Sequence, residues 1–231
     1  MEKIAEPLEY IRGFTEFLGC KIDLSKKPLI PRVETEFWVS KAINSILAFC
    51  RMQECCKDKN IKILDIFTGS GCIGLAVLSA LGGPATGGKR VLVTFADKEK
   101  KCIDQVKINL KINNATGIVR QSDVFSNIKG KFDYIFVNPP YVARKKIKQI
   151  QKSVLQHEPH SALFGGQDGL YYIKKFLKQA SVHLSTGGRI FLEFSPEQKK
   201  AIGELLKSLG YKAWKFNKDQ FDRFRWVEID S

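Results

Sequence analysis

Short apolar runs alternate with longer amphipathic stretches along most of this chain of 231 residues. The runs are rich in β-branched and aromatic residues, as is typical of buried strands, and they predict strands over residues 61–67, 91–96, 117–120, 132–137 and 189–194. The stretches carry apolar side chains at helical spacing and predict helices over residues 34–50, 72–81, 98–110, 169–184 and 196–209. Strands that alternate with helices predict an α/β fold with a doubly wound, mostly parallel sheet.

Both ends of the chain predict antiparallel pairs of strands. Residues 14–18 and 21–24, separated by Gly19-Cys20, predict a β-hairpin, and residues 211–216 and 225–229 predict a closing pair. The expected sheet then has seven strands, with an antiparallel terminal strand. We expect residues 1–33 to form a segment that carries the hairpin, and residues 34–231 to form the main domain. Residues 51–60 and 82–88 predict loops, and Gly187-Gly188 is predicted to end the helix before it.

The tetrapeptide Asn138-Pro139-Pro140-Tyr141 directly follows the apolar run 132–137. Ligands of an open α/β sheet bind outside the carboxyl ends of its strands, which places this tetrapeptide at the rim of a site. The Asn138 side-chain oxygen can accept a hydrogen bond from a substrate, and the Pro139 carbonyl is a second acceptor. Tyr141 offers a flat face to a planar group. This set favours a substrate with a planar –NH2 group; the alternative is an ordinary strand end.

A glycine-rich turn follows the run 61–67, and an acidic residue follows the run 91–96. The turn is Thr68-Gly69-Ser70-Gly71, where glycine lets the backbone approach a ligand closely. Asp97 ends the next strand, where a carboxylate can bind a ribose diol. Alone, such a turn is typical of any tight connection between a strand and a helix. Together with the tetrapeptide, these features at successive strand ends indicate a ligand site.

The chain is strongly basic, with 38 lysines and arginines against 24 acidic residues and a net charge of +14. This balance favours a polyanionic partner such as RNA, but it equally fits a chain that places lysine on every solvated face. A basic stretch follows Tyr141 and consists of Arg144, Lys145, Lys146, Lys148 and Lys152. Contact with ribosomal RNA and a solvated loop both remain open for it. No apolar run approaches the roughly 20 residues needed to cross a membrane.

The spacing of cysteine and histidine indicates no metal site. The six cysteines form no CxxC pair, and we expect them to be reduced thiols of a cytoplasmic protein. His157, Glu158 and His160 are close in sequence, but no further cluster of ligands accompanies them. A structural or solvated role is therefore expected for these three residues.

Seven segments of the chain occur in an order that resembles a known family. They are Ile30-Pro31-Arg32-Val33-Glu34-Thr35-Glu36, Asp65-Ile66-Phe67-Thr68-Gly69-Ser70-Gly71, Asp97, Asp123, Asn138-Pro139-Pro140-Tyr141, Glu158-Pro159-His160-Ser161-Ala162-Leu163 and Gly165-Gly166-Gln167-Asp168-Gly169-Leu170. Over residues 7–230 the chain resembles the class I S-adenosylmethionine-dependent methyltransferases that modify the N5 of a glutamine in peptide chain release factors. The Asn-Pro-Pro-Tyr element alone also occurs in adenine-N6 methyltransferases. The segments around Pro31 and Glu158 favour the glutamine enzymes.

The resemblance implies a Rossmann-like class I methyltransferase fold for residues 34–231, with S-adenosylmethionine as the cofactor and a release factor as the partner. It implies cofactor-binding roles for Asp65, Phe67, Thr68, Gly69, Ser70, Gly71, Asp97, Asp123, Val124 and Asn138. Within this set, the loop from Phe67 wraps the methionine part, Asp97 holds the ribose hydroxyls and Val124 lies against the adenine. Asn138, Pro139, Pro140 and Tyr141 would cradle the substrate amide. Phe67 replaces the small residue usual in the family, and the chain is expected to lack most of the family's amino-terminal helical domain.

Several functions fit these features. The favoured one is glutamine-N5 methylation of a release factor, because Glu34-Thr35-Glu36 follows Pro31-Arg32 as in that family. The same amide chemistry on a ribosomal protein and adenine-N6 methylation of nucleic acid are alternatives. A cofactor-binding scaffold without catalysis is a fourth, disfavoured by the intact tetrapeptide. In the favoured reaction, positioning of the amide would dominate, and no metal or general base is required.

Overall fold

A seven-stranded sheet runs through the computed structural model, which describes residues 4–52, 60–82 and 90–231. The strand order is β5-β4-β3-β6-β7-β9-β8. In that order the strands span Ile118–Gln121, Val91–Asp97, Ile61–Ile66, Phe132–Val137, Leu184–Glu193, Phe224–Asp230 and Trp214–Lys218. Among these strands β9 alone runs against the common direction, and it pairs antiparallel with both β7 and β8. The predicted mostly parallel sheet with an antiparallel terminal strand is confirmed.

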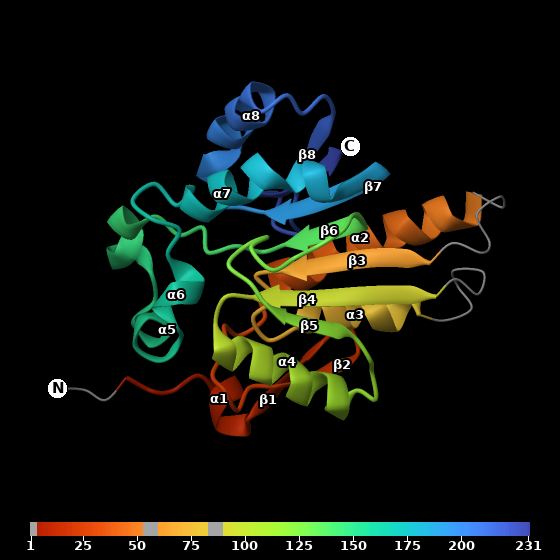
Figure 1. Cartoon of the computed structure of the whole chain (residues 1–231). Helices are drawn as coiled ribbons and strands as arrows, with labels where there is room; N and C mark the ends of the chain where they lie inside the picture. Colours follow the sequence, from red (N-terminus) through yellow and green to blue (C-terminus); the bar gives the residue numbers. More distant parts are fainter. Residues whose placement is uncertain (1–3, 53–59, 83–89) are drawn as a thin grey trace.

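Helices cover both faces of the sheet (Figure 1). One face carries α2 (Val33–Met52), α3 (Cys72–Leu81) and α4 (Lys100–Ile112). The other carries α7 (Tyr171–Ala180) and α8 (Lys199–Ser208). Because side chains alternate across a strand, β3 sends Ile61 and Ile63 into the first core and Leu64 and Ile66 into the second. Most of the predicted loops 51–60 and 82–88 lies outside the described residues.

The predicted amino-terminal hairpin is present and packs on the first face. It follows a short helix, α1 (Leu8–Arg12), and consists of β1 (Phe14–Phe17) and β2 (Cys20–Asp23). Its turn is Leu18-Gly19, both with positive φ, and Cys20 already belongs to β2. The Asn109 side chain of α4 accepts from Asp23 N at 2.8 Å, which ties the hairpin to the main sheet's helical layer.

The prediction that Gly187-Gly188 ends a helix is wrong. Helix α7 stops at Ala180, a short 3-10 turn (η4, Ser181–His183) follows, and β7 already begins at Leu184. The pairing of β6 with β7 shifts register between Phe132 and Tyr134, so the glycine pair lies within an irregular part of β7. Gly187 has φ +74°, and a Cβ on Gly188 would lie 2.9 Å from the Ser185 carbonyl oxygen. Glycine is therefore needed here inside a strand.

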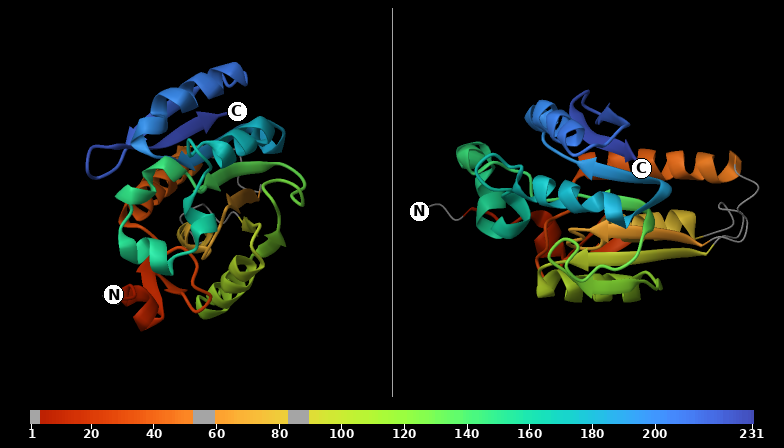
Figure 2. Two further views of the ribbon diagram at one scale, coloured as in Figure 1. Left: turned by 90° about the vertical axis from the view of Figure 1, so that its left-hand side faces the viewer. Right: turned by 45° about the horizontal axis from the view of Figure 1, so that its top comes forward.

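The connection between β6 and α7 lies across the carboxyl ends of the parallel strands. It contains a 3-10 helix, η3 (Arg144–Gln149), and two short helices, α5 (Lys152–His157) and α6 (His160–Leu163). The view onto that edge of the sheet shows this segment in front of the strand ends (Figure 2, left). A further 3-10 turn, η5 (Pro196–Gln198), precedes α8. In the described parts of the chain, no helix is both long and apolar enough to cross a bilayer.

Candidate active site

The turn after β3 is held against the end of β4. Thr68 N donates to the Ala96 carbonyl at 3.0 Å, and Gly69 N donates to the Asp97 carboxylate at 2.9 Å. Gly69 and Gly71 have φ values of +54° and +84°, and a Cβ on Gly71 would lie 3.1 Å from Val106. Phe67 also has a positive φ, of 60°, which is unusual for a residue with a Cβ. The predicted turn and Asp97 are therefore joined by a hydrogen bond at the carboxyl ends of two adjacent strands.

Asp65 lies beneath this turn and is fully buried. One carboxylate oxygen, Oδ2, accepts from Thr68 Oγ1 and, at 2.9 Å, from Gly74 N. The other oxygen, Oδ1, has no hydrogen-bond partner among the described residues. Burial raises the pKa of Asp65 to about 7, although both hydrogen bonds lower it. Because Oδ1 has no partner in the described part of the chain and burial disfavours the ionised carboxylate, Asp65 could accept a hydrogen bond from a ligand or pair with a cationic ligand group.

Replacing Asp65 with asparagine should flatten the pH dependence of the protein's stability. Because the pKa of Asp65 lies near 7 in the folded protein and near its ordinary 3.8 when unfolded, the folded state binds more protons between these values. The free energy of unfolding therefore falls as pH rises from about 4 to about 7. Denaturant titrations of the ligand-free protein across this range should show a shallower slope for Asp65→Asn. Asp104→Asn, at a partly exposed carboxylate, should keep the wild-type slope, and equal slopes for all three proteins would contradict the assignment.

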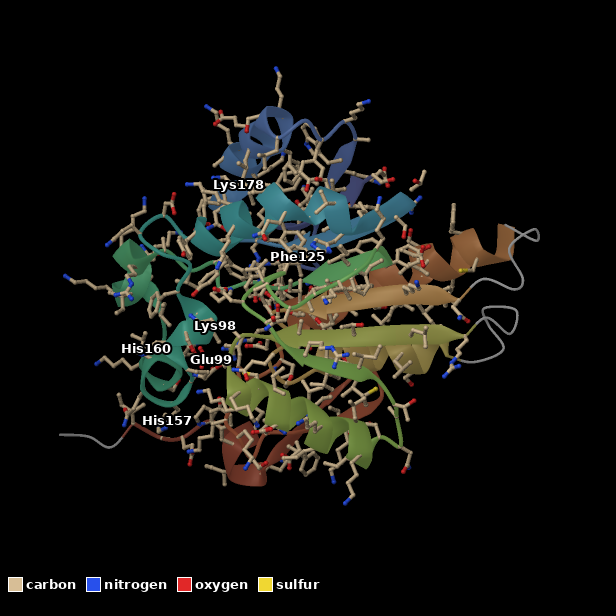
Figure 3. The ribbon with its side chains drawn as sticks, viewed as in Figure 1. Lys98, Glu99, Phe125, His157, His160 and Lys178 are labelled. Carbon is tan, nitrogen blue, oxygen red and sulfur yellow. The ribbon has the colours of Figure 1, made fainter. Side chains whose placement is uncertain are left out.

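A small cavity, of about 60 Å³, opens at the end of β4. Five residues predicted from the sequence line it: Phe67, Asp97, Asp123, Asn138 and Pro140. Tyr172 closes one side, with its ring edge-on to that of Phe67 at 5.7 Å between centroids. Figure 3 shows Lys98 and Glu99, which also line the cavity, facing the segment that contains α6.

Other predicted cofactor residues lie below this cavity rather than in its wall. Thr68, Ser70 and Val124 are buried. Val124 has φ 55°, and a β-branched residue in this conformation is strained. Asp123 forms an ion pair with Lys175 at 2.6 Å, between side chains that are both partly exposed. The predicted cofactor residues therefore lie in one region of the structure. Some of them line the cavity, and the buried ones lie behind the lining residues.

A larger cavity, of about 400 Å³, lies on the other side of Asn138. The tetrapeptide contributes Asn138, Pro139 and Tyr141 to its wall. The rest comes from the segment before α2, from the β6–α7 connection and from β7, and includes Leu29, Arg32, Gln151, Val154, Leu163 and Glu193. Asn138 and Ala162 of α6 line both cavities, so the two cavities adjoin at these residues.

Glu193, at the end of β7, organises the wall of the larger cavity. Its side chain is buried, and burial raises its pKa although three neighbours donate hydrogen bonds to it. Oε2 accepts from Thr35 Oγ1 at 2.7 Å and from Trp38 Nε1 at 2.6 Å. Oε1 accepts from the Tyr141 hydroxyl at 2.8 Å. The sequence analysis missed Glu193, although a charged residue at the end of an apolar strand is the same signal that identified Asp97.

Arg32, which lines the larger cavity, joins its segment to the distant segment that contains Glu158. The Arg32 guanidinium nitrogen Nη2 lies 2.7 Å and 2.8 Å from the two Glu158 oxygens, and Ile30 N donates to the same carboxylate at 3.2 Å. Glu158 is buried and Arg32 is partly exposed, so this charge-assisted pair has its carboxylate end shielded from water. The two segments that favoured the glutamine enzymes in the sequence are therefore in contact.

Each of the two histidines beside Glu158 has a ring nitrogen within hydrogen-bond distance of a backbone carbonyl. His157 Nε2 lies 3.3 Å from the Ile4 carbonyl, and His160 Nε2 lies 2.8 Å from the Leu155 carbonyl. Both come from the segment that covers the strand ends (Figure 3). Among residues 4–52, 60–82 and 90–231, no three His, Cys, Asp or Glu side chains gather in a way that could hold a metal ion.

The chain is similar to methyltransferases in sequence and in structure. A family model described as "Methyltransferase small domain" matches residues 50–167. A release factor glutamine methyltransferase of Streptococcus pneumoniae is 34% identical over 226 residues, which cover 97% of this chain and 75% of the relative. One from Thermodesulfovibrio yellowstonii is 33% identical over 216 residues, with 93% and 72% covered. A solved methyltransferase structure from Pyrococcus furiosus shares the fold, with a TM-score of 0.61 and 21% identity over 96% of this chain and 92% of that one.

These similarities confirm the family resemblance seen in the ordered motifs. The relatives align with nearly all of this chain at more than 30% identity, and the fold matches as well. The chain belongs to the family of release factor glutamine methyltransferases.

Proposed function

We propose that this protein transfers a methyl group from S-adenosylmethionine to the N5 amide nitrogen of the glutamine in the Gly-Gly-Gln motif of a peptide chain release factor. The observation that carries the proposal is the place of Asn138 between two cavities, one beside Asp97 and one beside Arg32 and Tyr141. A transferase needs its two reactants to meet, and Asn138 is the polar residue shared by the two cavity walls. The names of the relatives supply the substrate class.

The residues of the smaller cavity fit S-adenosylmethionine. Asp97 can accept from ribose hydroxyls, and its carboxylate is already fixed by Gly69 N and Glu99 N, each at 2.9 Å. The orphan oxygen of Asp65 and the open space around Gly69 suit the amino-acid part of the cofactor. The Phe67 and Tyr172 rings offer apolar faces to the cofactor. Tyr172 packs against Phe67 at one side of this cavity of about 60 Å³.

The chemistry depends on orientation of a weak nucleophile. The lone pair of a glutamine amide nitrogen is delocalised into its carbonyl, and the cofactor supplies a methyl group already activated by a sulfonium. Asn138 Oδ1 and the Pro139 carbonyl would accept the two amide N–H bonds and hold the nitrogen in line with that methyl. These hydrogen bonds strengthen as the nitrogen becomes positively charged, so they stabilise the transition state more than the ground state. The cofactor would leave as the neutral thioether, and the methylated nitrogen would then lose one of its protons to solvent.

The walls of the larger cavity fit an extended peptide side chain. The apolar residues Leu29, Val154 and Leu163 can contact the methylenes of glutamine, and the Tyr141 ring can pack against its planar amide.

The domain division at residue 33 and the roles of Ser70, Gly71, Asp123 and Val124 stay predictions of the sequence. A cytoplasmic place, where translation occurs, belongs to the same proposal.

The proposed reaction is tested with labelled cofactor and two forms of one release factor. Wild-type release factor should accept the label, and a form with asparagine in place of the motif's glutamine should not. Shortening the side chain by one methylene withdraws the amide from Asn138 and leaves the rest of the partner intact. Equal labelling of the two forms would place the methyl group elsewhere and contradict the proposal.

The basic stretch of η3 and α5 is proposed as a contact with ribosomal RNA. Lys145, Lys148 and Lys152 are exposed, and in the described part of the chain no acidic side chain pairs with them, whereas Lys146 is paired with Glu197 at 2.6 Å. Changing Lys145, Lys148 and Lys152 to glutamine should reduce the slope of log affinity for ribosomes against log salt by about 2. The same change at Lys207, Lys212 and Lys215, exposed around α8 and β8, is the matched control. Equal slopes for both triple variants would mean that the stretch is only solvated.

A further inference from the structure

We infer that Thr35, held by Glu193, orients the Asn138 side chain so that its amide oxygen is available to the substrate. Thr35 is thus a positioning residue for the proposed reaction, on which this inference rests. The contacts form a chain of hydrogen bonds from β7 through the first turn of α2 to the end of β6. Neither Thr35 nor Glu193 was assigned a role of this kind by the sequence.

The direction of the first hydrogen bond follows from Trp38. An indole N–H can only donate, and Trp38 Nε1 lies 2.6 Å from Glu193 Oε2, so this oxygen is an acceptor. Thr35 Oγ1 lies 2.7 Å from the same oxygen. With no proton on Oε2 itself, the single hydroxyl proton of Thr35 must therefore point at Glu193. This holds whether or not the other carboxylate oxygen carries a proton.

The direction of the second hydrogen bond follows from the first. With its proton engaged, Thr35 Oγ1 can only accept from Asn138, whose side chain approaches at 3.3 Å. The amide group of Asn138 must then present its Nδ2, since its oxygen would meet a second acceptor without a proton between them. The Asn138 oxygen is left on the side away from Thr35. That is the arrangement that an acceptor for a substrate –NH2 group requires.

The surroundings make this chain of contacts rigid. Thr35, Trp38 and Glu193 are all buried, and the Trp38 ring stacks on Phe136 and Trp226 with 6.1 Å between centroids in each case. The other Glu193 oxygen accepts from the Tyr141 hydroxyl, so one carboxylate holds both ends of the tetrapeptide. An oriented group that loses such support gains freedom to rotate, which slows a reaction that depends on alignment.

The test compares Thr35→Val with Thr35→Ser. Valine keeps the shape of threonine and removes the hydroxyl, whereas serine keeps the hydroxyl and removes a methyl group. We expect Thr35→Val to lower kcat for release factor methylation roughly tenfold to a hundredfold, with the KM for the release factor and the cofactor Kd unchanged. Thr35→Ser should stay near wild type. In an Asn138→Ala background, Thr35→Val should cause no further loss, because a residue that acts only through Asn138 has nothing left to orient.

A readout without catalysis separates this inference from the proposed function. The Asn138 side-chain NH2 signals, identified by their loss in Asn138→Ala, should shift in the NMR spectrum of Thr35→Val and return in Thr35→Ser. If Thr35→Val keeps the wild-type kcat and leaves the Asn138 NH2 signals unchanged, the inference is overturned and the proposed function still stands. An equal fold loss of activity with and without Asn138 would also overturn it, since Thr35 would then act on the fold. A wild-type protein that methylates no release factor would overturn the proposed function, and the NMR signals would still decide the orientation.

Discussion

Replacing Asn138 with alanine should slow methyl transfer to the release factor about 10²–10³-fold, the usual cost of one oriented contact to the reacting group. Alanine removes the amide oxygen that is proposed to accept from the substrate nitrogen, and the substrate amide can then rotate out of line. Asn138 lines two cavities, and among the described residues its side chain makes one hydrogen bond, at 3.3 Å to Thr35. The protein should therefore still fold, and cofactor affinity should fall only modestly.

Single-turnover rates with bound cofactor provide the measurement for Asn138→Ala. Asn217→Ala is the matched control, because the Asn217 side chain only donates to the Lys215 carbonyl on β8, away from both cavities. The control should react at the wild-type rate. An Asn138→Ala protein that transfers methyl at the wild-type rate would remove Asn138 from the chemistry.

Replacing Asp97 with alanine should weaken binding of S-adenosylmethionine by about 1.5–3 kcal/mol, or roughly tenfold to more than a hundredfold in Kd. The carboxylate is proposed to accept from the ribose hydroxyls, and charge-assisted hydrogen bonds are among the stronger ones. It also accepts from Gly69 N at 2.9 Å, so part of the loss would come from a looser turn. Methylation at saturating cofactor should recover much of its rate, because Asp97 does not contact the larger cavity.

Calorimetric titration with the cofactor tests this expectation. Asp104→Ala is a suitable control, since Asp104 is a partly exposed carboxylate on α4 that pairs with Lys100 at 2.5 Å and takes no part in either cavity. Asp97→Asn keeps one acceptor oxygen and should bind with intermediate affinity. The same Kd for Asp97→Ala and wild type would exclude Asp97 from the cofactor site.

The elements that the sequence predicts well are those whose signals are local. Helix α3 spans Cys72–Leu81 and strand β6 spans Phe132–Val137, both as predicted, because a glycine or a proline marks where the pattern changes. Gly187-Gly188 shows where local signals fail. A glycine pair after a helical pattern is typical of a helix end, but here the strand pairing with β6 requires glycine inside β7. Only the register of a distant strand distinguishes the two cases.

Site residues were predictable from the sequence where a polar residue directly follows an apolar strand. Asp97 and Asn138 were found in this way, and Glu193 could have been found by the same reasoning. The contact between Arg32 and Glu158 was not predictable from periodicity, because the two residues are 126 positions apart and meet only through the fold. The same is true of Tyr172, which reaches Phe67 from α7. Contacts across the sheet's carboxyl edge require the topology as well as the sequence.

The most direct test of the proposed function is mass spectrometry of two candidate substrates in one reaction. Purified release factor and a mixture of DNA and RNA would be incubated together with the protein and isotope-labelled S-adenosylmethionine, then digested and analysed separately. We expect the release factor peptide that contains Gly-Gly-Gln to gain one labelled methyl group, with fragmentation placing it on the glutamine side chain, and adenine to remain unlabelled. Labelled N6-methyladenine together with an unmodified glutamine peptide would contradict glutamine methylation and favour the adenine alternative.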